Sequence, residues 1–317
     1  MRRRVGGALA VSVLLMECCE AADRYELVRT LHSDHGFVNS LALSPDGTLL
    51  ALATDSGGVT IWKAGSGALV RTLGADRGAV YAVTFDPHGR LLATGGLDGI
   101  ARVWDVGTGQ PLHSFEGHSG WINAVAFAAD GNQLLTAGRD STVRVWDVSG
   151  GRSVRVIDDY SSEVFVVAAS ADGQWIGSDK GDTFCVRERG NGRELAAGAV
   201  GQWGINALAF GPAKNEFTSS GYDGKVWVWN VLESRVVKSI PVQGGPVISL
   251  AIRPDGIVVA LLCTGDSTVK LLDTRSWKEI ARLPGVSYPA GSVSFSGNGR
   301  LLAAGGGDSP IRIWREP

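Results

Sequence analysis

The chain has 317 residues, of which 44% are hydrophobic and 20% charged, and its formal net charge is −2. Aliphatic residues in this proportion, with so little net charge, exclude a disordered chain. The balance of charges lacks the basic excess that would neutralise many phosphates, so no nucleic acid partner is expected. The length allows two domains, although all-β chains of this size often fold as one.

The first 22 residues differ in composition from the rest of the chain. Arg2–Arg4 form a positive segment, Val5–Met16 form an apolar run of 12 residues, and small residues follow around Ala21. This layout predicts a signal peptide over residues 1–22, and the apolar run is too short to span a bilayer. We therefore expect an exported chain, periplasmic or secreted, with no membrane span after cleavage; without a working signal it would be cytoplasmic. A lipoprotein signal acylated at Cys18 and an ordinary buried segment are weaker alternatives.

The remainder of the chain repeats with a period of about 42 residues. A tight-turn signal recurs at steps of 41 to 43 residues, as "SPDG", "DPHG", "AADG", "SADG", "GPAKN", "RPDG" and "SGNG". Each turn is followed by an apolar run that ends in a bulky residue, at Trp62, Trp104, Trp146, Val186, Trp229, Leu272 and Trp314. Two independent landmarks with one period indicate seven copies of one structural unit. We number these units one to seven in chain order.

Each unit reads as four short β-strands. In unit three they are "INAVAF", "QLLTAG", "TVRVWD" and "SVRVI", separated by Gly, Asp and Ser turns. Several strands are apolar or small on both faces, which a sheet needs when it is covered on both sides. Seven such sheets must close into a ring, because an open row would leave two apolar faces bare. The pattern predicts an all-β fold over residues 23–317: a single seven-bladed β-propeller of four-stranded antiparallel blades.

The last unit contains only three strands, and the missing copy lies at the other end of the repeats. Tyr25–Leu31, "YELVRTL", matches Ala68–Leu73, "ALVRTL", almost letter for letter. We therefore expect the N-terminal strand to complete the last blade. This pairing closes the ring and covers an edge that would otherwise invite aggregation.

Over residues 24–317 the chain resembles the WD-repeat β-propeller family. The motif is clearest in blade three, "GHSGWINAVAFAADGNQLLTAGRDSTVRVWD". The resemblance implies a hydrogen-bonded structural tetrad in that blade, formed by His118, Thr136, Asp140 and Trp146. Other blades keep only part of the set: blade two has Thr94, Asp98 and Trp104 but Asp76 in place of the histidine. Blade four diverges most, with Val186 at the position of the tryptophan and a turn two residues shorter, and is expected to be the loosest blade.

Three motifs that could carry chemistry are better explained by structure. "GHSG" at Gly117 looks like a hydrolase nucleophile elbow, but Trp121 follows and no helix does. "HSDH" at His32–His35 offers metal ligands, yet no second pair is expected nearby, so no metal site is predicted. Cys185 and Cys263 lie almost two repeats apart, so a disulfide between them is not expected. No cofactor is predicted either.

The resemblance also implies that the loops before the innermost strands and those between second and third strands share one rim. Large aromatic residues and arginine, the types that dominate binding hot spots, fall there. The predicted partner-binding rim consists of Phe37, Asn39, Tyr81, Leu97, Trp121, Asn123, Arg139, Phe165, Asn206 and Tyr222, and Glu163 and Ile248 take aligned positions. The aromatic rings could also simply cap the ends of blades.

The interpretation of the whole chain is a non-enzymatic scaffold that binds a protein or peptide through this rim. The alternative is a propeller with a ligand-binding or hydrolytic site in the central channel. Such a site needs titratable groups that converge from several innermost strands. Strands such as "NAVAF" and "VISLAI" offer no Asp, Glu, His, Lys or Arg, which favours the scaffold.

Overall fold

The computed structural model describes residues 25–32, 36–74, 78–199, 204–211, 215–286 and 291–316. The predicted signal peptide, residues 1–22, lies outside these ranges, as do Asp76 and Ser33–His35. Within these ranges every regular element is a β-strand, and these residues form no helix long and apolar enough to cross a membrane.

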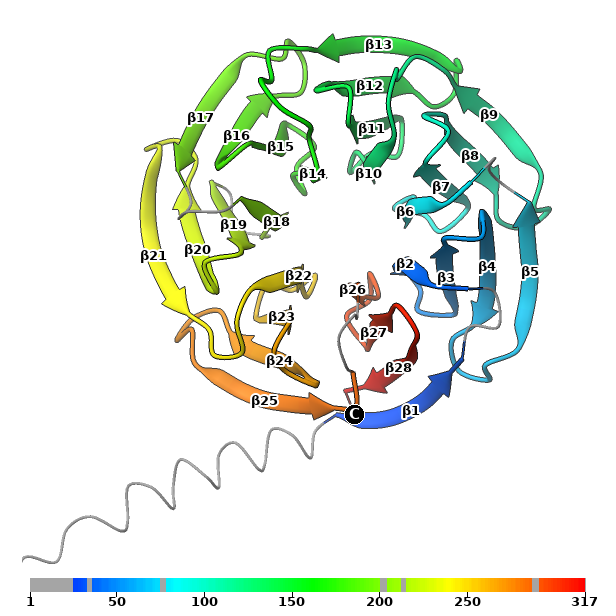
Figure 1. Ribbon diagram of the computed structural model, residues 1–317, viewed down its shortest axis with the longest axis vertical. Coiled ribbons are helices and arrows are strands. Elements are labelled where there is room, and N and C mark those ends of the chain that lie inside the picture. Colours follow the sequence, from blue (N-terminus) through cyan, green and yellow to red (C-terminus); the bar gives the residue numbers. More distant parts are fainter. Residues whose placement is uncertain are drawn as a thin grey trace, which may run out of the picture.

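The strands form seven four-stranded antiparallel sheets, as predicted, and Figure 1 shows them arranged as a ring. Blade one consists of β2 (Val38–Leu43), β3 (Leu49–Thr54), β4 (Gly58–Lys63) and β5 (Leu69–Gly74). Blade two consists of β6 (Val80–Phe85), β7 (Leu91–Gly96), β8 (Ala101–Asp105) and β9 (Pro111–Phe115). Blade three consists of β10 (Ile122–Phe127), β11 (Gln133–Gly138), β12 (Val143–Asp147) and β13 (Arg152–Ile157).

The other blades repeat this order from the channel outward. Blade four consists of β14 (Val167–Ala169), β15 (Trp175–Lys180), β16 (Thr183–Glu188) and β17 (Glu194–Ala199). Blade five consists of β18 (Ile205–Phe210), β19 (Glu216–Gly221), β20 (Lys225–Asn230) and β21 (Arg235–Pro241). Blade six consists of β22 (Val247–Ile252), β23 (Val258–Cys263), β24 (Thr268–Asp273) and β25 (Glu279–Pro284). Blade seven consists of β26 (Ser292–Phe295), β27 (Leu301–Gly306), β28 (Ser309–Arg315) and, at its outer edge, β1 (Glu26–Leu31).

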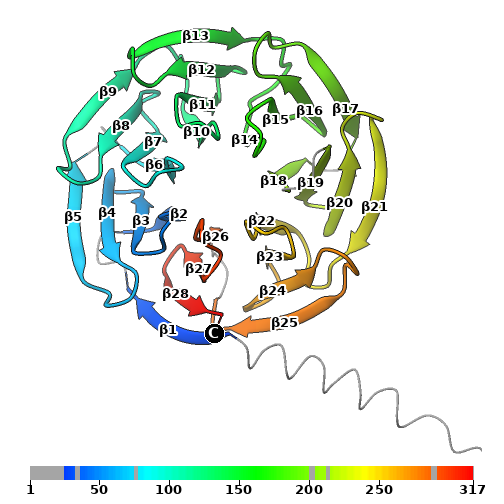
Figure 2. The same cartoon turned by 180° about the vertical axis from the view of Figure 1, so that it is seen from behind.

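The N-terminal strand closes the ring, which confirms the prediction from the missing strand. β1 runs antiparallel to β28, with Glu26 opposite Arg315 and Leu31 opposite Ile311. Figure 2, the view from behind, shows β1 lying outside β28 and next to β25 at the seam. The first and last strands of the fold therefore hold each other in place.

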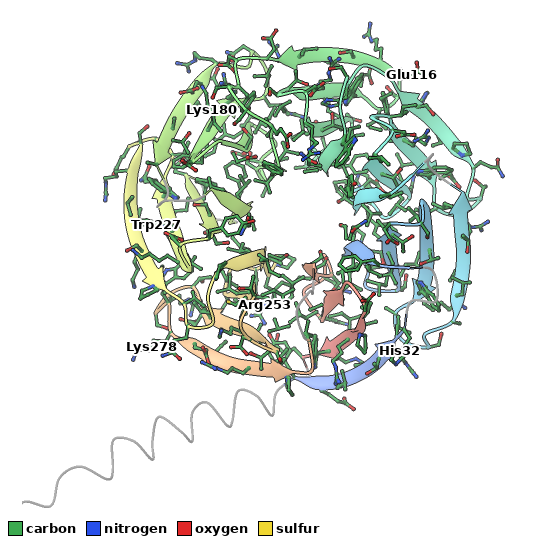
Figure 3. All side chains as sticks on the ribbon, in the orientation of Figure 1. His32, Glu116, Lys180, Trp227, Arg253 and Lys278 are labelled. Carbon is green, nitrogen blue, oxygen red and sulfur yellow. The ribbon has the colours of Figure 1, made fainter. Side chains whose placement is uncertain are left out.

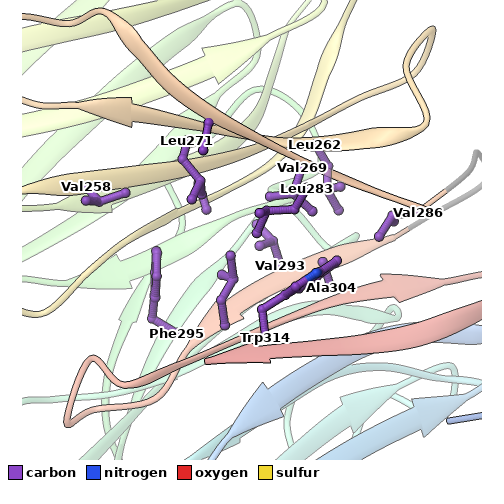
Figure 4. Close-up of a cluster of buried hydrophobic side chains, with 13 residues drawn as sticks. Val258, Leu262, Val269, Leu271, Leu283, Val286, Val293, Phe295, Ala304 and Trp314 are labelled. Atoms are coloured by element: carbon purple, nitrogen blue, oxygen red, sulfur yellow. The ribbon is translucent and has the colours of Figure 1, made fainter. Parts of the chain in front are cut away.

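The hydrophobic core is divided into seven clusters, and each lies between two neighbouring blades. Figure 4 shows the cluster between blades six and seven, where Val258, Leu271 and Leu283 of one blade meet Phe295 and Trp314 of the next. Full burial of one such aliphatic side chain stabilises a fold by roughly 1.5–3 kcal/mol. No blade can gain this alone, which is the physical reason for the closed ring.

The turns between first and second strands explain the recurring "DG" and "HG" pairs. Gly131 has a φ of 71°, a conformation that favours glycine, and its N–H donates to the carbonyl of Ala128 at 2.8 Å. In blade two the buried carboxylate of Asp86 accepts hydrogen bonds from the N–H groups of His88 and Leu91. These turns lie at the end of the blades opposite the predicted rim.

The strand register corrects one prediction in blade four. In blade three, Thr136 faces Arg144 and Leu134 faces Trp146 across the sheet. In blade four, Ser178 faces Cys185 and Ile176 faces Arg187. Arg187, and not Val186, therefore stands at the position of the tryptophan. The sequence alignment was wrong by one residue because it followed the apolar run, which ends at Val186.

Candidate functional site

The hydrogen-bonded tetrad of blade three is present with all four members. His118 Nδ1 lies 2.9 Å from Asp140 Oδ1, and His118 Nε2 lies 2.7 Å from Thr136 Oγ1. The indole N–H of Trp146 donates to the same Thr136 oxygen at 2.9 Å. One threonine hydroxyl thus serves two ring nitrogens, and both are buried with it.

The environment of the tetrad disfavours the charged form of its histidine. Burial lowers the pKa of His118, and the hydrogen bond to Asp140 only partly opposes this effect. Burial acts to raise the pKa of Asp140, but hydrogen bonds from His118 and Thr142 outweigh it and leave that pKa below its usual value. The His118 side chain is fully buried, and Ser119 is fixed by its N–H, which donates to Asp140. The "GHSG" segment is therefore part of the hydrogen-bond network that holds blade three together.

Other blades use fragments of the same network. The indole N–H of Trp104 donates to Thr94 at 3.1 Å, and that of Trp229 donates to Ser219 at 3.1 Å. In blade six, which has no tryptophan there, the buried ammonium of Lys270 lies 2.6 Å from Asp266. Each arrangement satisfies polar groups that would be costly to bury without a partner.

Blade four has a substitute network that sequence reasoning missed. Tyr160 precedes the buried residue Val164 by four positions, as His118 precedes Ile122 in blade three, and the Tyr160 hydroxyl lies 2.7 Å from Ser178 Oγ. Burial raises the pKa of this phenol to about 12. The guanidinium of Arg187 lies 5.6 Å from the centre of the Tyr160 ring and 2.6 Å from Asp159. The spacing of Tyr160 was the signal that could have revealed it.

A ridge of predicted rim residues crosses from blade two to blade four. The ring centres of Tyr81 and Trp121 are 5.6 Å apart. The Arg139 guanidinium lies over the Trp121 ring, 4.1 Å from its centre, and its Nε is 2.8 Å from Glu163 Oε2. A tilted ring contact, a cation–π contact and an ion pair thus link four side chains from three blades. We call Tyr81, Trp121, Arg139 and Glu163 the ridge.

Next to the ridge is a pocket of about 550 Å³. Its lining includes the second residues of several innermost strands, so the pocket lies at the mouth of the channel, on the side of blade four. Its lining residues are Tyr81, Asn123, Ser162, Glu163, Phe165, Val166, Asp179, Gly181, Asp182, Gly204, Ile205, Asn206, Tyr222 and Ile248. Phe165 and Tyr222 are 50% and 54% exposed, which is unusual for aromatic residues of this size. We call this cavity the mouth pocket.

The mouth pocket contains a buried carboxyl group that was not among the predicted residues. Asp179 is 2% exposed, and its Oδ1 accepts the N–H groups of Phe165 and Val166, each at 2.8 Å. Burial raises the pKa of Asp179 to about 6, although the two hydrogen bonds act to lower it. The register places small or apolar residues at its position in the other blades, namely Ala53, Gly95, Ala137, Ser220, Leu262 and Gly305. This break in the repeat was visible in the sequence.

The three predicted rim asparagines connect neighbouring blades. The amide N–H groups of Asn39, Asn123 and Asn206 donate to the backbone carbonyls of Val80, Val164 and Val247 in the next blade, at 2.9–3.0 Å. Asn123 and Asn206 still line the mouth pocket, whereas Asn39 does not. The predicted residues Phe37 and Leu97 are half-buried and also lie outside its lining. The predicted rim is therefore part frame and part exposed surface.

The described residues offer no group of three or more His, Cys, Asp or Glu side chains that could hold a metal ion. His32 is exposed, and the rest of the "HSDH" segment lies outside the described ranges. Cys185 and Cys263 are free, buried thiols on blades four and six. Burial raises the pKa of the Cys185 thiol to about 12, so this group is not an activated nucleophile.

A family model described as "WD domain, G-beta repeat" matches residues 25–63, 67–105, 109–147, 195–230 and 277–315. These segments cover more than half of the chain. The chain belongs to the WD-repeat family. The two longest stretches of this WD-repeat chain between matched segments, 148–194 and 231–276, contain most of blade four and blade six. They are the blades in which Arg187 and Leu272 take the place of the tryptophan.

Curated relatives share parts of this WD-repeat propeller. Pre-mRNA-processing factor 19 from Caenorhabditis elegans is 29% identical over 35% of this chain and 23% of its own length. Polycomb protein EED from Chaetomium thermophilum is 30% identical over 31% of this chain and 18% of its own length. Target of rapamycin complex subunit LST8 from Rattus norvegicus is 32% identical over 30% of this chain and 29% of its own length. The chain thus spans less than a third of each of these relatives.

Proposed function

We propose that this WD-repeat protein is a non-enzymatic scaffold that binds a protein or peptide through the ridge and the mouth pocket. The observation that carries the proposal is the continuity of the two features. Tyr81 and Glu163 belong to both, so one surface runs from Trp121 across the pocket to the exposed rings of Phe165 and Tyr222. It combines a concave anchor point with a preordered aromatic row.

The residue types support binding to a macromolecular partner. Tryptophan, tyrosine and arginine supply most of the binding energy at protein interfaces, and they do so best when held rigid before the partner arrives. Here Trp121 lies between Tyr81 and Arg139, and Glu163 fixes the guanidinium from the next blade. Little side-chain entropy is left to lose when a partner covers the ridge.

A hydrolytic site in the channel has less support. The described innermost strands contribute mainly Val, Ala, Leu, Ser and Asn, and the mouth pocket offers Ser162 and carboxyl groups but neither histidine nor cysteine. Nucleophilic catalysis needs an activated hydroxyl or thiol beside a base. Nothing in the described lining supplies that pair.

The proposal is tested with a displayed library of random 12-residue peptides. Wild-type protein is expected to enrich a peptide family, whereas the triple variant Tyr81→Ala, Trp121→Ala, Tyr222→Ala should lose at least about 100-fold in affinity for it, since each hot-spot truncation costs about 1–2 kcal/mol or more. Thermal unfolding of the variant should remain cooperative.

A second triple variant serves as the control. Leu112→Ala, Val154→Ala and Leu232→Ala remove three apolar side chains that are 48%, 47% and 64% exposed on the outer part of the ring. This variant should bind the selected peptides as wild type does. Peptides that bind both variants equally, or a rim variant that no longer folds, would contradict the assignment of the rim.

We also propose that residues 1–22 direct export of the chain. The support is the sequence alone: a positive head, an apolar run of 12 residues and small residues near Ala21. N-terminal sequencing of the protein purified from its source should show a chain that begins close to residue 22. A chain purified with Met1 intact from the cytoplasm would contradict the proposal.

A further inference from the structure

The mouth pocket exists because blade four is shorter at the rim than its neighbours. In blade three, residues 139–142 connect β11 to β12, and they bring Arg139 to the ridge. In blade four only Gly181 and Asp182 connect β15 to β16. Because this turn is shorter, no side chains from it cover β14 as Arg139 and its neighbours would in blade three. Both turn residues line the pocket.

The inner strand of blade four is also short, and it begins just after two residues bound by Asp179. The Asp179 carboxylate takes the N–H groups of Phe165 and Val166, which precede β14, so that strand keeps only three residues. The ring of Phe165 is left half-exposed beside the opening. Asp179 therefore forms the floor of the cavity and positions one of its walls.

No cation of the described chain balances this buried carboxyl group. The adjacent side chain, Lys180, which is labelled in Figure 3, is directed to the other face of β15, as strand alternation requires, and pairs with Glu194 at 3.3 Å. The lining of the mouth pocket contains no lysine, arginine or histidine among the described residues.

One further carboxylate, Asp182 in the short turn, adds to the negative charge of the pocket. Glu163 stands where the pocket meets the ridge, and its charge is paired with Arg139. The faces of aromatic rings such as Tyr222 carry partial negative charge and attract cations. An anionic ligand would be repelled from this cavity, and a purely apolar one would bury Asp179 without a partner.

We propose that the mouth pocket receives one basic side chain, lysine or arginine, from the bound partner segment, with Asp179 as its counter-ion. The inference rests on the proposed function and names the chemistry of the partner at that site. Phe165 and Tyr222 hold the aliphatic stem of the basic residue, and the ridge holds the apolar residues next to it. A peptide segment, and not a free small cation, is the occupant because the cavity continues into the ridge.

The test compares selections from the same peptide library on three proteins. Asp179→Asn removes the charge and keeps an amide oxygen that can accept the two backbone hydrogen bonds. Asp86→Asn is the matched control, since Asp86 is also buried and accepts two backbone N–H groups, but at the opposite end of a blade. All three proteins are checked by thermal unfolding.

Wild type and Asp86→Asn should enrich peptides with Lys or Arg at one fixed position between apolar residues. Replacing that residue by norleucine should weaken binding to wild type at least about tenfold, and Asp179→Asn should weaken binding of the basic peptide by a similar factor. The norleucine peptide should bind Asp179→Asn at least as tightly as wild type, because it no longer covers an unpaired charge. That double comparison separates the ion pair from general damage to the pocket.

The failures of the two proposals are distinguishable. Selected peptides without a fixed basic position, or basic peptides that bind Asp179→Asn as tightly as wild type, overturn the basic-residue inference. If those peptides still lose affinity for the triple rim variant, the proposed function stands. A library that yields no specific peptide overturns both.

Discussion

Asp179 provides a test of the structure that needs no partner. Its pKa in the fold is about 6, raised by burial from the ordinary value of 3.8. Because the folded state binds this proton more tightly than the unfolded chain does, folding stability falls as the pH rises from about 4 to about 6. Above that range the fold carries the full cost of the buried charge. Asp179→Asn should remove this cost and stabilise the protein at neutral pH.

The magnitude follows from the two pKa values. A difference of about two pH units, at about 1.4 kcal/mol for each, corresponds to about 3 kcal/mol at pH 8. The new amide needs its own hydrogen-bond partners at the floor of the pocket, which reduces the gain, so we expect 1–3 kcal/mol, or about 2–6 °C in Tm. Near pH 4, where the wild-type carboxyl group is protonated in the fold, the variant should have no stability advantage.

Thermal and urea unfolding of wild type, Asp179→Asn and Asp86→Asn at pH 4, 6 and 8 measure this effect. Glu163 and Asp182, the other carboxyl groups of the pocket, are the same in all three proteins, so the differences between the proteins report on the substituted residue. The Asp86→Asn control reports the effect of replacing a buried carboxyl group that accepts two backbone N–H groups away from the pocket. An Asp179→Asn protein that is equally or less stable than wild type at pH 8 would refute the reasoning, because the carboxylate would then have a cationic partner.

Three further predictions concern the frame. Thr136→Val leaves one ring nitrogen of His118 and one of Trp146 without a partner and should lower the free energy of unfolding by about 2–5 kcal/mol. Thr94→Val affects only Trp104 and should lower it by about 1–3 kcal/mol. Equal losses for the two variants in urea titrations would contradict this. Deletion of residues 25–31 exposes the edge of β28 and should cause association detectable by sedimentation, so a monomer with an unchanged Tm would argue against the closure. In hydrogen exchange, amides of the three-residue β14 should exchange faster than those of β10, and equal protection would show that blade four is not the loosest.

The ring and the tetrad were predictable because each rests on redundant signals. The turns and the bulky residues repeat with one period, and the copy of a closing strand at Tyr25–Leu31 leaves only one place for it. His118 and Asp140 lie 22 residues apart and meet because the blade repeats a known hairpin geometry. Where a blade follows the repeat, residue type and spacing determine the contacts.

Blade four was not predictable in the same way because its residues keep the positions and change the chemistry. Tyr160 stands for a histidine, Ser178 for a threonine and Arg187 for a tryptophan, so no single residue type marks the network. The shorter turn was evident in the sequence, but the space that it leaves depends on the neighbouring blades. Asp179 could be noticed as a break in the repeat, yet its direction depends on a strand register that the apolar pattern misplaced by one residue.

The position of the mouth pocket follows from the energetics of the ring. A blade that lost its tetrad and gained nothing would weaken two cores, since each core is shared with a neighbour. Blade four retains both because Tyr160, Ser178 and Arg187 reconnect its strands. That support allows Asp179 to remain buried at a cost of about 3 kcal/mol in the absence of a counter-ion. A partner that supplied a cation would recover part of this energy on binding, so the proposed affinity for a basic residue would have the same physical source as the cost of burying Asp179.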